Sequence, residues 1–221
     1  MRLLADGTPP TAAQRARGAR LAERFEALYP DIRTALDWDT PWQLLVSTVV
    51  SAQTTDENVN KAMPALFSRF PEPDDLAHAD PSEVEELLFS TGFYRQKTKS
   101  VIGLAAVLVD EHGGTVPDDM DSLTALPGVG RKTASVVLAE VWDRPAIAVD
   151  THVKRVANRL GLTASDDPVK VEQDLKAQVP QRHWSRLSMR MIQFGRDVCD
   201  ARNPRCRACP LRRSCPWPDK R

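Results

Sequence analysis

The sequence predicts an all-α fold, and three observations support this prediction. Apolar residues recur at helical spacing along most of the chain, clean alternation of apolar and polar residues is missing, and proline and glycine interrupt the pattern at intervals of about one short helix. We therefore expect about ten short helices. The chain has no repeat of fixed period and no low-complexity segment, which indicates a compact protein and not a solenoid.

Start signals and apolar stripes place the first helices. Thr40-Pro41 and Asp80-Pro81 each combine an N-cap residue with a proline at the first helical position. Two apolar stripes are visible in this half of the chain: Leu44, Leu45, Thr48, Val49 and Ala52, and then Val101, Leu104, Ala105, Leu108 and Val109.

The second half continues with the same signals. A helix is expected to end before Pro127, and the helix after the next turn has its apolar side at Val136, Val137 and Val141. Asp167-Pro168 marks the start of a later helix. Asp150 opens another helix, whose stripe consists of Val149, Val153, Val156, Ala157 and Leu160.

Composition excludes several classes of protein. Of the 221 residues, 42% are hydrophobic and 27% charged, which excludes a disordered chain. No segment is apolar enough for a membrane span or a secretory signal, so we expect a cytoplasmic protein. Lys plus Arg and Asp plus Glu both number 30, so nucleic-acid binding would require a local basic surface. Arginines do recur between Arg182 and Arg213, although a charge run is more often a solvated face.

The segment Leu126-Pro127-Gly128-Val129-Gly130-Arg131-Lys132 combines a tight turn with a lysine in the first turn of a helix. Backbone amides of Gly128 and Gly130 at a helix N-terminus suit a phosphate, and the alternative is a turn without a ligand. Lys132 is unfavourable beside the positive end of the helix dipole. That dipole, together with burial, would lower the lysine pKa and free the amine for nucleophilic attack, whereas a solvated or phosphate-contacting lysine is the alternative.

Asp150 lies one helix and a loop after Lys132, a separation that permits the chain to return to the same place. Its simplest role is the N-cap of the following helix. A carboxylate that faces the lysine would also orient the amine or accept its proton. The sequence does not separate the two roles. His152, two residues later, is a candidate for a phosphate contact, although a lone helical histidine is more often structural or solvated.

The four cysteines all lie near the C-terminus, at Cys199, Cys206, Cys209 and Cys215. Disulfides are disfavoured in the cytosol, so this clustering predicts a shared metal group. Only one short C-x2-C knuckle is present, between prolines that force turns, which favours an iron-sulfur cluster over zinc. Unliganded thiols are the third possibility.

Together these motifs resemble the endonuclease III family of helix-hairpin-helix DNA glycosylases. LPGVGRKTA resembles the family's hairpin, which contains the nucleophilic lysine. AVDTHVKRVANRL resembles the family's helix that begins with an essential aspartate, and the cysteine spacing resembles that of the family's [4Fe-4S] loop. LLVSTVVSAQTTDENVNKA resembles the segment whose glutamine fills the gap left by an extruded base, which indicates Gln53. TGFYRQK resembles the loop that wedges the opposite strand, with Phe93 where an aliphatic residue is usual.

The resemblance covers roughly Leu21 to Pro216 and implies a fold and an activity. It implies two helical domains that flank a DNA-binding cleft: a six-helix barrel at 33–144 that includes the hairpin, and a second domain of 1–32 plus 145–221 that carries the cluster loop at 199–215. The implied activity is that of a bifunctional DNA glycosylase and abasic-site lyase for oxidised pyrimidines in duplex DNA, which acts by base flipping, lysine attack at C1′ and β-elimination.

The implied site consists of Lys132 and Asp150 as catalytic residues, Gln53, Phe93, Gly128, Gly130, Arg131 and His152 as DNA-binding residues, and the four cysteines as ligands of the cluster. We expect a monomer that associates with the nucleoid through DNA. A related adenine-specific glycosylase is disfavoured because Lys132 is present and no acid precedes Gln53 at Thr48–Val50. The alternative from another class is a non-catalytic helix-hairpin-helix module with a metal-bound tail.

Overall fold

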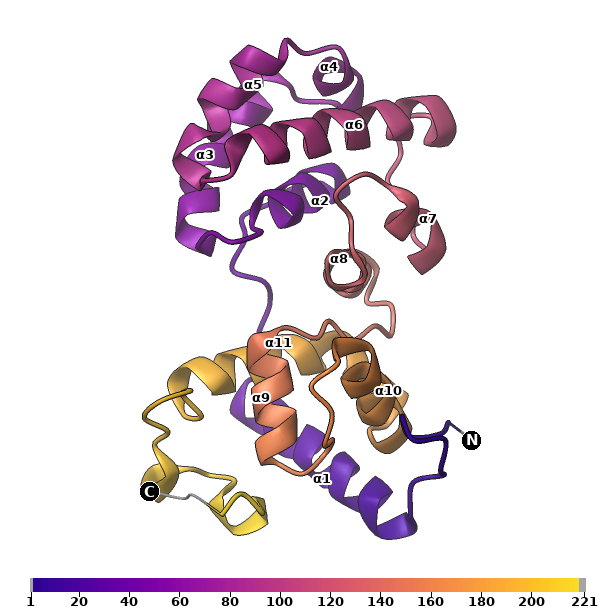
Figure 1. Ribbon diagram of the computed structural model, residues 1–221, viewed down its shortest axis with the longest axis vertical. Helices are drawn as coiled ribbons and strands as arrows, with labels where there is room; N and C mark the ends of the chain where they lie inside the picture. The colour runs from indigo at the N-terminus through magenta and orange to yellow at the C-terminus, as the bar shows by residue number, and fades with distance from the viewer. Residues whose placement is uncertain (1, 219–221) are drawn as a thin grey trace. The chain divides into compact units, whose positions relative to one another are not determined.

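The computed structural model describes residues 2–218, and within them the chain forms eleven α-helices, four short 3-10 helices and no β-strand (Figure 1). The all-α prediction is confirmed. Among the described residues, none of the helices combines the length and hydrophobicity that crossing a bilayer requires. The chain divides into two compact units, Thr34–Trp142 and the combination of Met1–Arg33 with Asp143–Arg221.

The unit Thr34–Trp142 contains helices α2 to α8. Their bounds are α2 Pro41–Val50, α3 Asp56–Arg69, α4 Pro73–Ala77, α5 Pro81–Leu88, the 3-10 helix η1 Phe89–Thr91, α6 Tyr94–His112, α7 Met120–Ala125 and α8 Arg131–Trp142. The long helix α6 contacts α2, α4 and α5, and α8 packs against α2 and α7.

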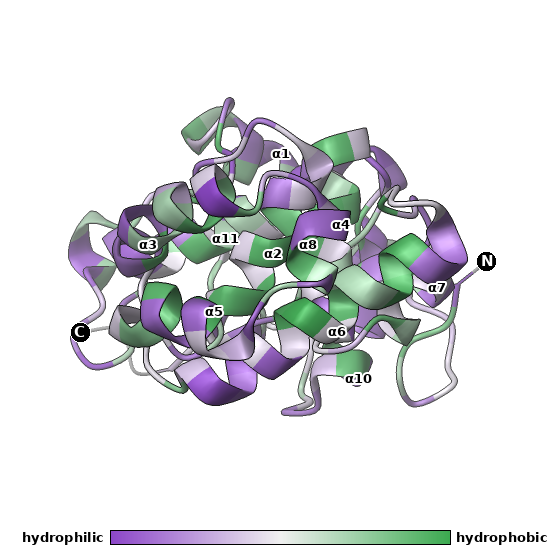
Figure 2. Ribbon diagram, turned by 90° about the horizontal axis from the view of Figure 1, so that it is seen from above, coloured by the Kyte–Doolittle hydropathy of each residue, from purple (hydrophilic) through white to green (hydrophobic). Residues whose placement is uncertain are grey.

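Helix α2 is the most deeply buried element of this unit. All its residues except Pro41 and Gln43 are buried, including Ser47 and Thr48. A helix that is apolar on all sides belongs inside a core, and hydrophobic residues are conspicuous along α2 and α8 in Figure 2. The apolar stripe predicted this helix, but the helix ends at Val50 and the exposed Ala52 lies in the turn beyond it.

The second unit joins the two ends of the chain. It contains α1 Ala12–Leu28, α9 Thr151–Arg159, α10 Pro168–Gln178, η2 Gln181–His183, α11 Trp184–Asp197, η3 Cys206–Ala208 and η4 Arg212–Ser214. Helix α1 packs against α10 and α11, and α9 packs against both of these helices as well. Phe25 of α1 and Phe194 of α11 meet edge to face, with 5.3 Å between ring centroids.

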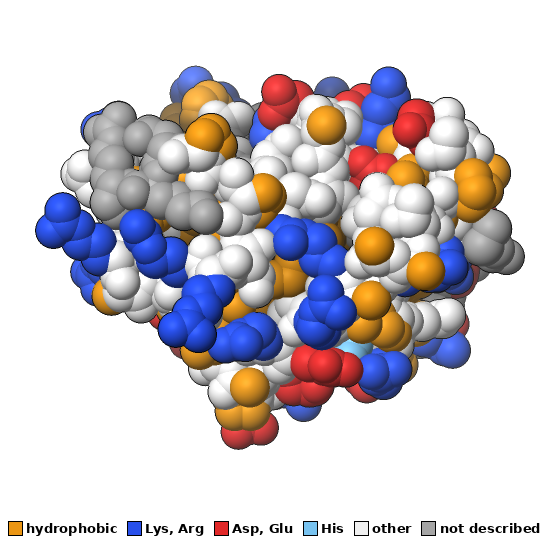
Figure 3. All heavy atoms as spheres, turned by 90° about the horizontal axis from the view of Figure 1, so that it is seen from below, with side chains coloured by type: hydrophobic (Ala, Val, Ile, Leu, Met, Phe, Trp, Pro, Cys, Tyr) orange, Lys and Arg blue, Asp and Glu red, His pale blue; other side chains and the backbone are white. Residues whose placement is uncertain are grey.

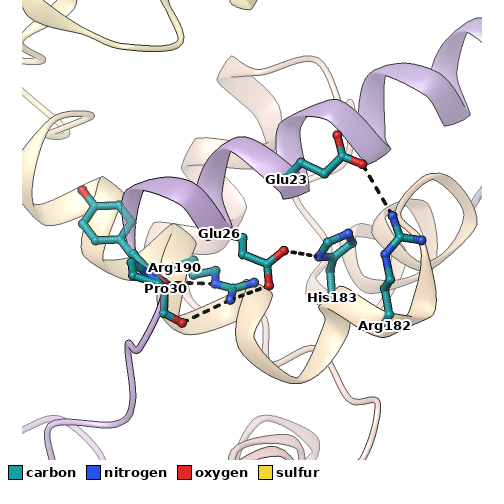
Figure 4. Close-up of polar contacts among 7 residues, drawn as sticks. Glu23, Glu26, Pro30, Arg182, His183 and Arg190 are labelled. Carbon is teal, nitrogen blue, oxygen red and sulfur yellow. Dashed lines mark hydrogen bonds and ion pairs between the residues drawn. The ribbon is translucent and has the colours of Figure 1, made fainter.

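Polar contacts reinforce the packing of α1 on α11 (Figure 4). The buried guanidinium of Arg190 donates to the Glu26 carboxylate at 3.0 Å and to the carbonyl oxygens of Tyr29 and Pro30. His183, 3% exposed, lies with Nδ1 3.5 Å from the same carboxylate, and neither ring nitrogen has a hydrogen bond. Burial lowers the pKa of His183, and the Glu26 carboxylate partly opposes this effect.

Local start signals in the sequence correspond to real helix caps. Thr40, Asp80 and Asp167 are the N-caps of α2, α5 and α10, and each side chain accepts a hydrogen bond from a backbone amide of the first turn. In each case the following proline occupies the first helical position. These predictions are therefore confirmed.

Candidate functional site

The turn between α7 and α8 is built on two glycines with different conformations. Gly128 has φ +75°, whereas Gly130 lies outside the left-handed region. A Cβ atom on Gly128 would stand 2.7 Å from Cβ of Ser100 in α6 and 3.4 Å from a methyl group of Val49 in α2, whereas a Cβ on Gly130 would meet open space. Gly128 is therefore required by the fold, and Gly130 leaves the backbone open to a ligand.

Buried side chains anchor this turn, and its basic residues are exposed. Leu126 and Val129 are buried, and the Val129 amide donates to the Leu126 carbonyl. Arg131 and Lys132 follow in the first turn of α8, and both are exposed, while the helix becomes buried from Ala134 onward. The burial predicted for Lys132 is therefore not found in the structure, where its side chain is exposed.

Asp150 is the N-cap of α9, as its position in the sequence predicted. Its Oδ1 accepts a hydrogen bond of 2.8 Å from the Val153 amide, and the side chain is half-buried. No hydrogen bond occupies Oδ2 within the described residues. One carboxylate oxygen therefore caps the helix while the other is available to a ligand.

His152 is held against α11 rather than extended into solvent. Its Nδ1 lies 3.1 Å from Nη2 of Arg155, and Arg155 also donates to the carbonyls of Gly195 and Cys199. Burial lowers the pKa of His152, while the Asp150 carboxylate opposes this effect. A Cβ on Gly195 would be 3.0 Å from this ring. The geometry favours the structural interpretation of His152, and its phosphate contact stays a prediction.

Gln53 and Phe93 share an unusual backbone conformation. Both have left-handed φ values, +57° and +50°, and among the described non-glycine residues only Asp143 does the same. Each such residue carries a strain of about 1–3 kcal/mol that the surrounding structure must offset, and strain of this kind clusters at functional sites. Gln53 lies in the turn after α2, and Phe93 is the N-cap of α6 with 66% of its surface exposed.

Two polar side chains fix the loop that precedes Phe93. The buried Lys97 ammonium donates to the Thr91 carbonyl at 2.7 Å, and burial lowers its pKa. Asn58, at the start of α3, donates to the Ser90 carbonyl at 3.1 Å. Since α3 follows the Gln53 turn directly, this bond joins the two loops. Gly128 lies against Val49 and Ser100, so the unit brings together the segments of Gln53, Phe93 and Gly128, three of the segments predicted to contact DNA.

The four cysteines lie in one segment after α11, and all are half-buried free thiols. Cys199, Cys209 and Cys215 pack against the core of their unit. Burial raises the pKa of Cys209, and the nearby sulfur atoms of the other three cysteines raise it further, which places the four thiols in one neighbourhood. Among residues 2–218, no three His, Cys, Asp or Glu side chains are grouped closely enough to hold a single metal ion.

Arg159, at the end of α9, organises this cysteine segment, although no feature of the sequence singled it out. Its guanidinium donates to the carbonyls of Asp200 and Ala201 at 2.7 and 2.9 Å and lies 3.4 Å from the Cys199 sulfur. The same group stacks over the Trp217 ring at 4.1 Å. Helix α9 therefore carries Asp150 at one end and the main support of the cysteine segment at the other.

Basic side chains are exposed on this unit. Arg202, Arg205, Arg207, Arg212 and Arg213 of the cysteine segment are exposed. The polar residues that line a cavity of about 340 Å³ are Arg17, Arg20, Glu23 and Arg24 of α1 together with Ser214. Figure 3 shows Lys and Arg side chains gathered on one part of the face seen from below. A local basic surface thus accompanies the net charge of zero.

Comparison with known proteins gives consistent matches over nearly the whole chain. The description HhH-GPD superfamily base excision DNA repair protein matches residues 46–181. The chain is 48% identical to endonuclease III of Synechocystis sp. over 206 residues, which cover 93% of this chain and 94% of the relative. It is 42% identical to endonuclease III of Bacillus subtilis over 200 residues, 90% of this chain and 91% of the relative.

Two solved structures are also similar to this chain over nearly its whole length. One is a non-covalent endonuclease III-DNA complex, with a TM-score of 0.86, 41% identity, and coverage of 94% of this chain and 96% of the other. The other is a trapped endonuclease III-DNA covalent intermediate, with the same TM-score and identity and coverage of 94% and 97%.

Proposed function

The chain belongs to the endonuclease III family and is a base-excision-repair DNA glycosylase and abasic-site lyase, and on this premise we propose that Lys132 and Asp150 perform its chemistry. Its partner is duplex DNA with a damaged base or an abasic site. We further propose oxidised pyrimidines as the substrates. A damaged base stacks and pairs less well, so extruding it costs less than extruding an intact base.

Lys132 is the proposed nucleophile. The neutral Nζ forms a bond to C1′ as the bond between C1′ and the base breaks, and the base leaves with the electron pair and takes up a proton. Nζ then loses a proton and the C1′–O4′ bond of the sugar breaks, which gives a protonated Schiff base and leaves O4′ as a hydroxyl. This Schiff base acidifies a C2′ proton, and its removal forms a C2′–C3′ double bond as the C3′–O bond breaks and the 3′ phosphate leaves. Lys132 is exposed in the free protein, so any desolvation of its amine must come from the bound DNA.

Asp150 is the proposed acid–base partner. Because Oδ1 is committed to the α9 cap, Oδ2 is the atom that accepts the lysine proton or stabilises positive charge on the sugar. The capping bond fixes the carboxylate rotamer, and this fixed orientation limits the reorganisation that the reaction requires.

The DNA is held by segments of the unit Thr34–Trp142. The amides of Gly128 and Gly130 bind a backbone phosphate at the N-terminus of α8, and Arg131 adds a positive charge. Gln53 fills the space of the extruded nucleotide and Phe93 wedges the opposite strand. The fixed, strained backbones of these two residues support this assignment because they present both side chains to solvent without prior rearrangement.

The cysteine segment is proposed to hold a [4Fe-4S] cluster through Cys199, Cys206, Cys209 and Cys215. The donor set fits, because four free, half-buried thiols share one neighbourhood, three of them pack against the hydrophobic core, and the Arg159 guanidinium lies beside the Cys199 sulfur. When bound, the cluster supplies cross-links that fold the segment. The arginines at 202, 205, 207 and 212 would then be presented to DNA phosphates.

The observation that carries the proposal is an exposed lysine directly after the glycine turn that opens α8, in a chain 41% identical to a protein trapped covalently on DNA. Borohydride reduction of the enzyme on a duplex with one thymine glycol tests it, because hydride converts the Schiff base to a stable amine. We expect wild-type protein and Lys170→Ala to be trapped, and Lys132→Ala and Asp150→Asn to be trapped poorly. Lys170 is a matched control, an exposed lysine in the first turn of α10.

Equal trapping of Lys132→Ala would mean that another amine is the nucleophile. If no protein is trapped and none releases the base, the chain acts as a DNA-binding module with a metal-bound tail. In that case the colour and the iron and sulfide content of the purified protein would still decide between an iron-sulfur cluster and zinc.

A further inference from the structure

The loop between α5 and α6 exposes a second aromatic ring beside Phe93. Five large hydrophobic residues are exposed in the described chain: Leu3, Leu28, Phe89, Phe93 and Val169. The only two aromatic residues among them, Phe89 and Phe93, are four positions apart and each is 66% exposed. Single exposed hydrophobic residues are common, but two phenylalanines within one short loop form a specific surface.

Phe89 is held in position by its neighbours. Its ring lies 5.1 Å from the ring of Tyr94, at an interplanar angle of 50°. The Arg95 guanidinium lies 5.2 Å from the Tyr94 ring and 3.6 Å from the Glu85 carboxylate. A ring that already has a fixed orientation loses little conformational freedom when a flat partner stacks on it.

The backbone under Phe89 is also fixed. Thr91 donates its hydroxyl hydrogen to the Leu88 carbonyl at 2.7 Å, and its own carbonyl accepts from the buried Lys97. Asn58 binds the carbonyl of Ser90, the residue after Phe89. The exposure of Phe89 is therefore a property of an ordered loop with three internal anchors.

The chemistry next to Phe89 suits a nucleic acid. A flat aromatic face binds any base, and cationic side chains beside it bind phosphates. Arg95 and Lys99 are exposed in the first two turns of α6, and the Arg95 side chain is 78% exposed despite its contact with Glu85. Rings accompanied by positive charge are expected at a surface that binds bases and the phosphates that link them.

We propose that Phe89 is a second stacking surface for DNA, which contacts a base or deoxyribose of the strand opposite the extruded nucleotide, next to the position that Phe93 enters. The inference rests on the proposed wedge function of Phe93. Phe89 acts as a positioning residue: it supports the distorted strand beside the wedge and makes no contact with the reacting atoms.

Binding to a duplex with a tetrahydrofuran abasic-site analogue, followed by fluorescence anisotropy, tests the proposal. Stacking of one base on an aromatic ring is worth about 1–3 kcal/mol, so Phe89→Ala should raise Kd by roughly fivefold to a hundredfold. Phe89→Trp should preserve the affinity, since it keeps a flat face. Val169→Ala, which shortens an exposed hydrophobic residue of the other unit, should leave Kd unchanged.

A second measurement reports the stack directly. With 2-aminopurine in the opposite strand next to the analogue and protein at saturation, Phe89→Ala should change the fluorescence of the bound probe relative to wild type. Thermal melts of each variant exclude unfolding as the cause. The proposal is overturned if Phe89→Ala binds like wild type while Phe93→Ala binds weakly, or if Phe89→Trp loses as much affinity as Phe89→Ala. If neither Phe93→Ala nor Phe89→Ala affects binding, the wedge function of the whole loop fails as well.

Discussion

At the scale of single residues, Asp150 combines a structural and a chemical role in one carboxylate. Oδ1 caps α9 through the Val153 amide, and Oδ2 has no hydrogen bond within the described chain. Asparagine caps helices about as well as aspartate, but it cannot accept a proton at neutral pH. Replacing Asp150 by asparagine can therefore separate the capping role from the chemical role, which the sequence alone did not distinguish.

We predict that Asp150→Asn retains the unfolding free energy of the wild type and loses most base-release activity. Asp150→Ala should lose both, with a stability cost of about 1 kcal/mol for the missing cap. Urea denaturation and single-turnover base release measure the two effects. An Asn variant with normal turnover would show that the carboxylate serves only as a cap.

His183 gives a second prediction at this scale, for stability against pH. Because burial lowers the pKa of His183 in the folded protein, the fold favours the neutral ring. Its contribution to stability is complete above the unfolded-state pKa of about 6.5 and is lost as the pH falls through the folded-state pKa. The carboxylates of Glu23 and Glu26 oppose the effect, and Arg182 and Arg190 add to it.

His183→Phe keeps an apolar ring at this buried position and removes the titration. We expect the wild type to lose stability relative to this variant as the pH is lowered below about 6.5. Thermal unfolding of both proteins across this pH range measures the difference in stability between them. His152 and the other titrating groups are present in both proteins, so their contributions cancel in this difference. Parallel curves for the two proteins would contradict the prediction.

At the scale of elements, the hairpin before α8 illustrates how two identical residues acquire different functions. Gly128 has a left-handed φ and lies against Ser100 and Val49, whereas Gly130 has neither constraint. The first glycine therefore serves the packing of the hairpin against α2 and α6. The second leaves a backbone surface without a Cβ where the proposed phosphate binds.

This difference predicts unequal stability costs for two alanine substitutions that both weaken DNA binding. Gly128→Ala should cost about 1–2 kcal/mol for the left-handed backbone, plus the cost of displacing Ser100, and should weaken DNA binding as the hairpin shifts. Gly130→Ala should cost less, at most about 1 kcal/mol, because alanine is a poorer N-cap residue than glycine, and it should weaken DNA binding by adding a Cβ where the phosphate is proposed to approach. Chemical denaturation and anisotropy measure both quantities. Unchanged affinity in Gly130→Ala would argue against close approach of a phosphate at this glycine.

At the scale of the whole molecule, DNA binding must arise from the placement of charge, because Lys plus Arg and Asp plus Glu both number 30. The exposed arginines of the cysteine segment are one local positive region. Each phosphate that a protein neutralises contributes about 0.9 to the slope of log K against log salt concentration. The slope therefore reports how many phosphates the protein contacts, which the net charge of the chain does not.

We predict that Arg205→Gln combined with Arg207→Gln lowers this slope by about 2 and weakens binding equally on different DNA sequences. Lys61→Gln is the matched control, because Lys61 is an exposed cation in an i,i+4 pair with Glu57, and it should leave the slope unchanged. An unchanged slope in the double variant would place the cysteine segment away from the phosphates.

The sequence by itself determined the features that depend on neighbouring residues. Helical periodicity identified the all-α class, and the N-caps at Thr40, Asp80, Asp150 and Asp167 were recognisable because a cap bonds amides only two or three residues away. The clustered cysteines and the hairpin motif were visible for the same reason, since each lies within one short segment.

Only the tertiary structure decided how distant segments constrain one another. Such contacts explain why position 128 must be glycine, since Ser100 and Val49 leave no room for a Cβ there. They also explain how Arg159 binds the cysteine segment and why Gln53 and Phe93 adopt left-handed backbones. Residue type and spacing carry little information about these contacts, because the partners are far apart in the chain and meet only when the helices pack.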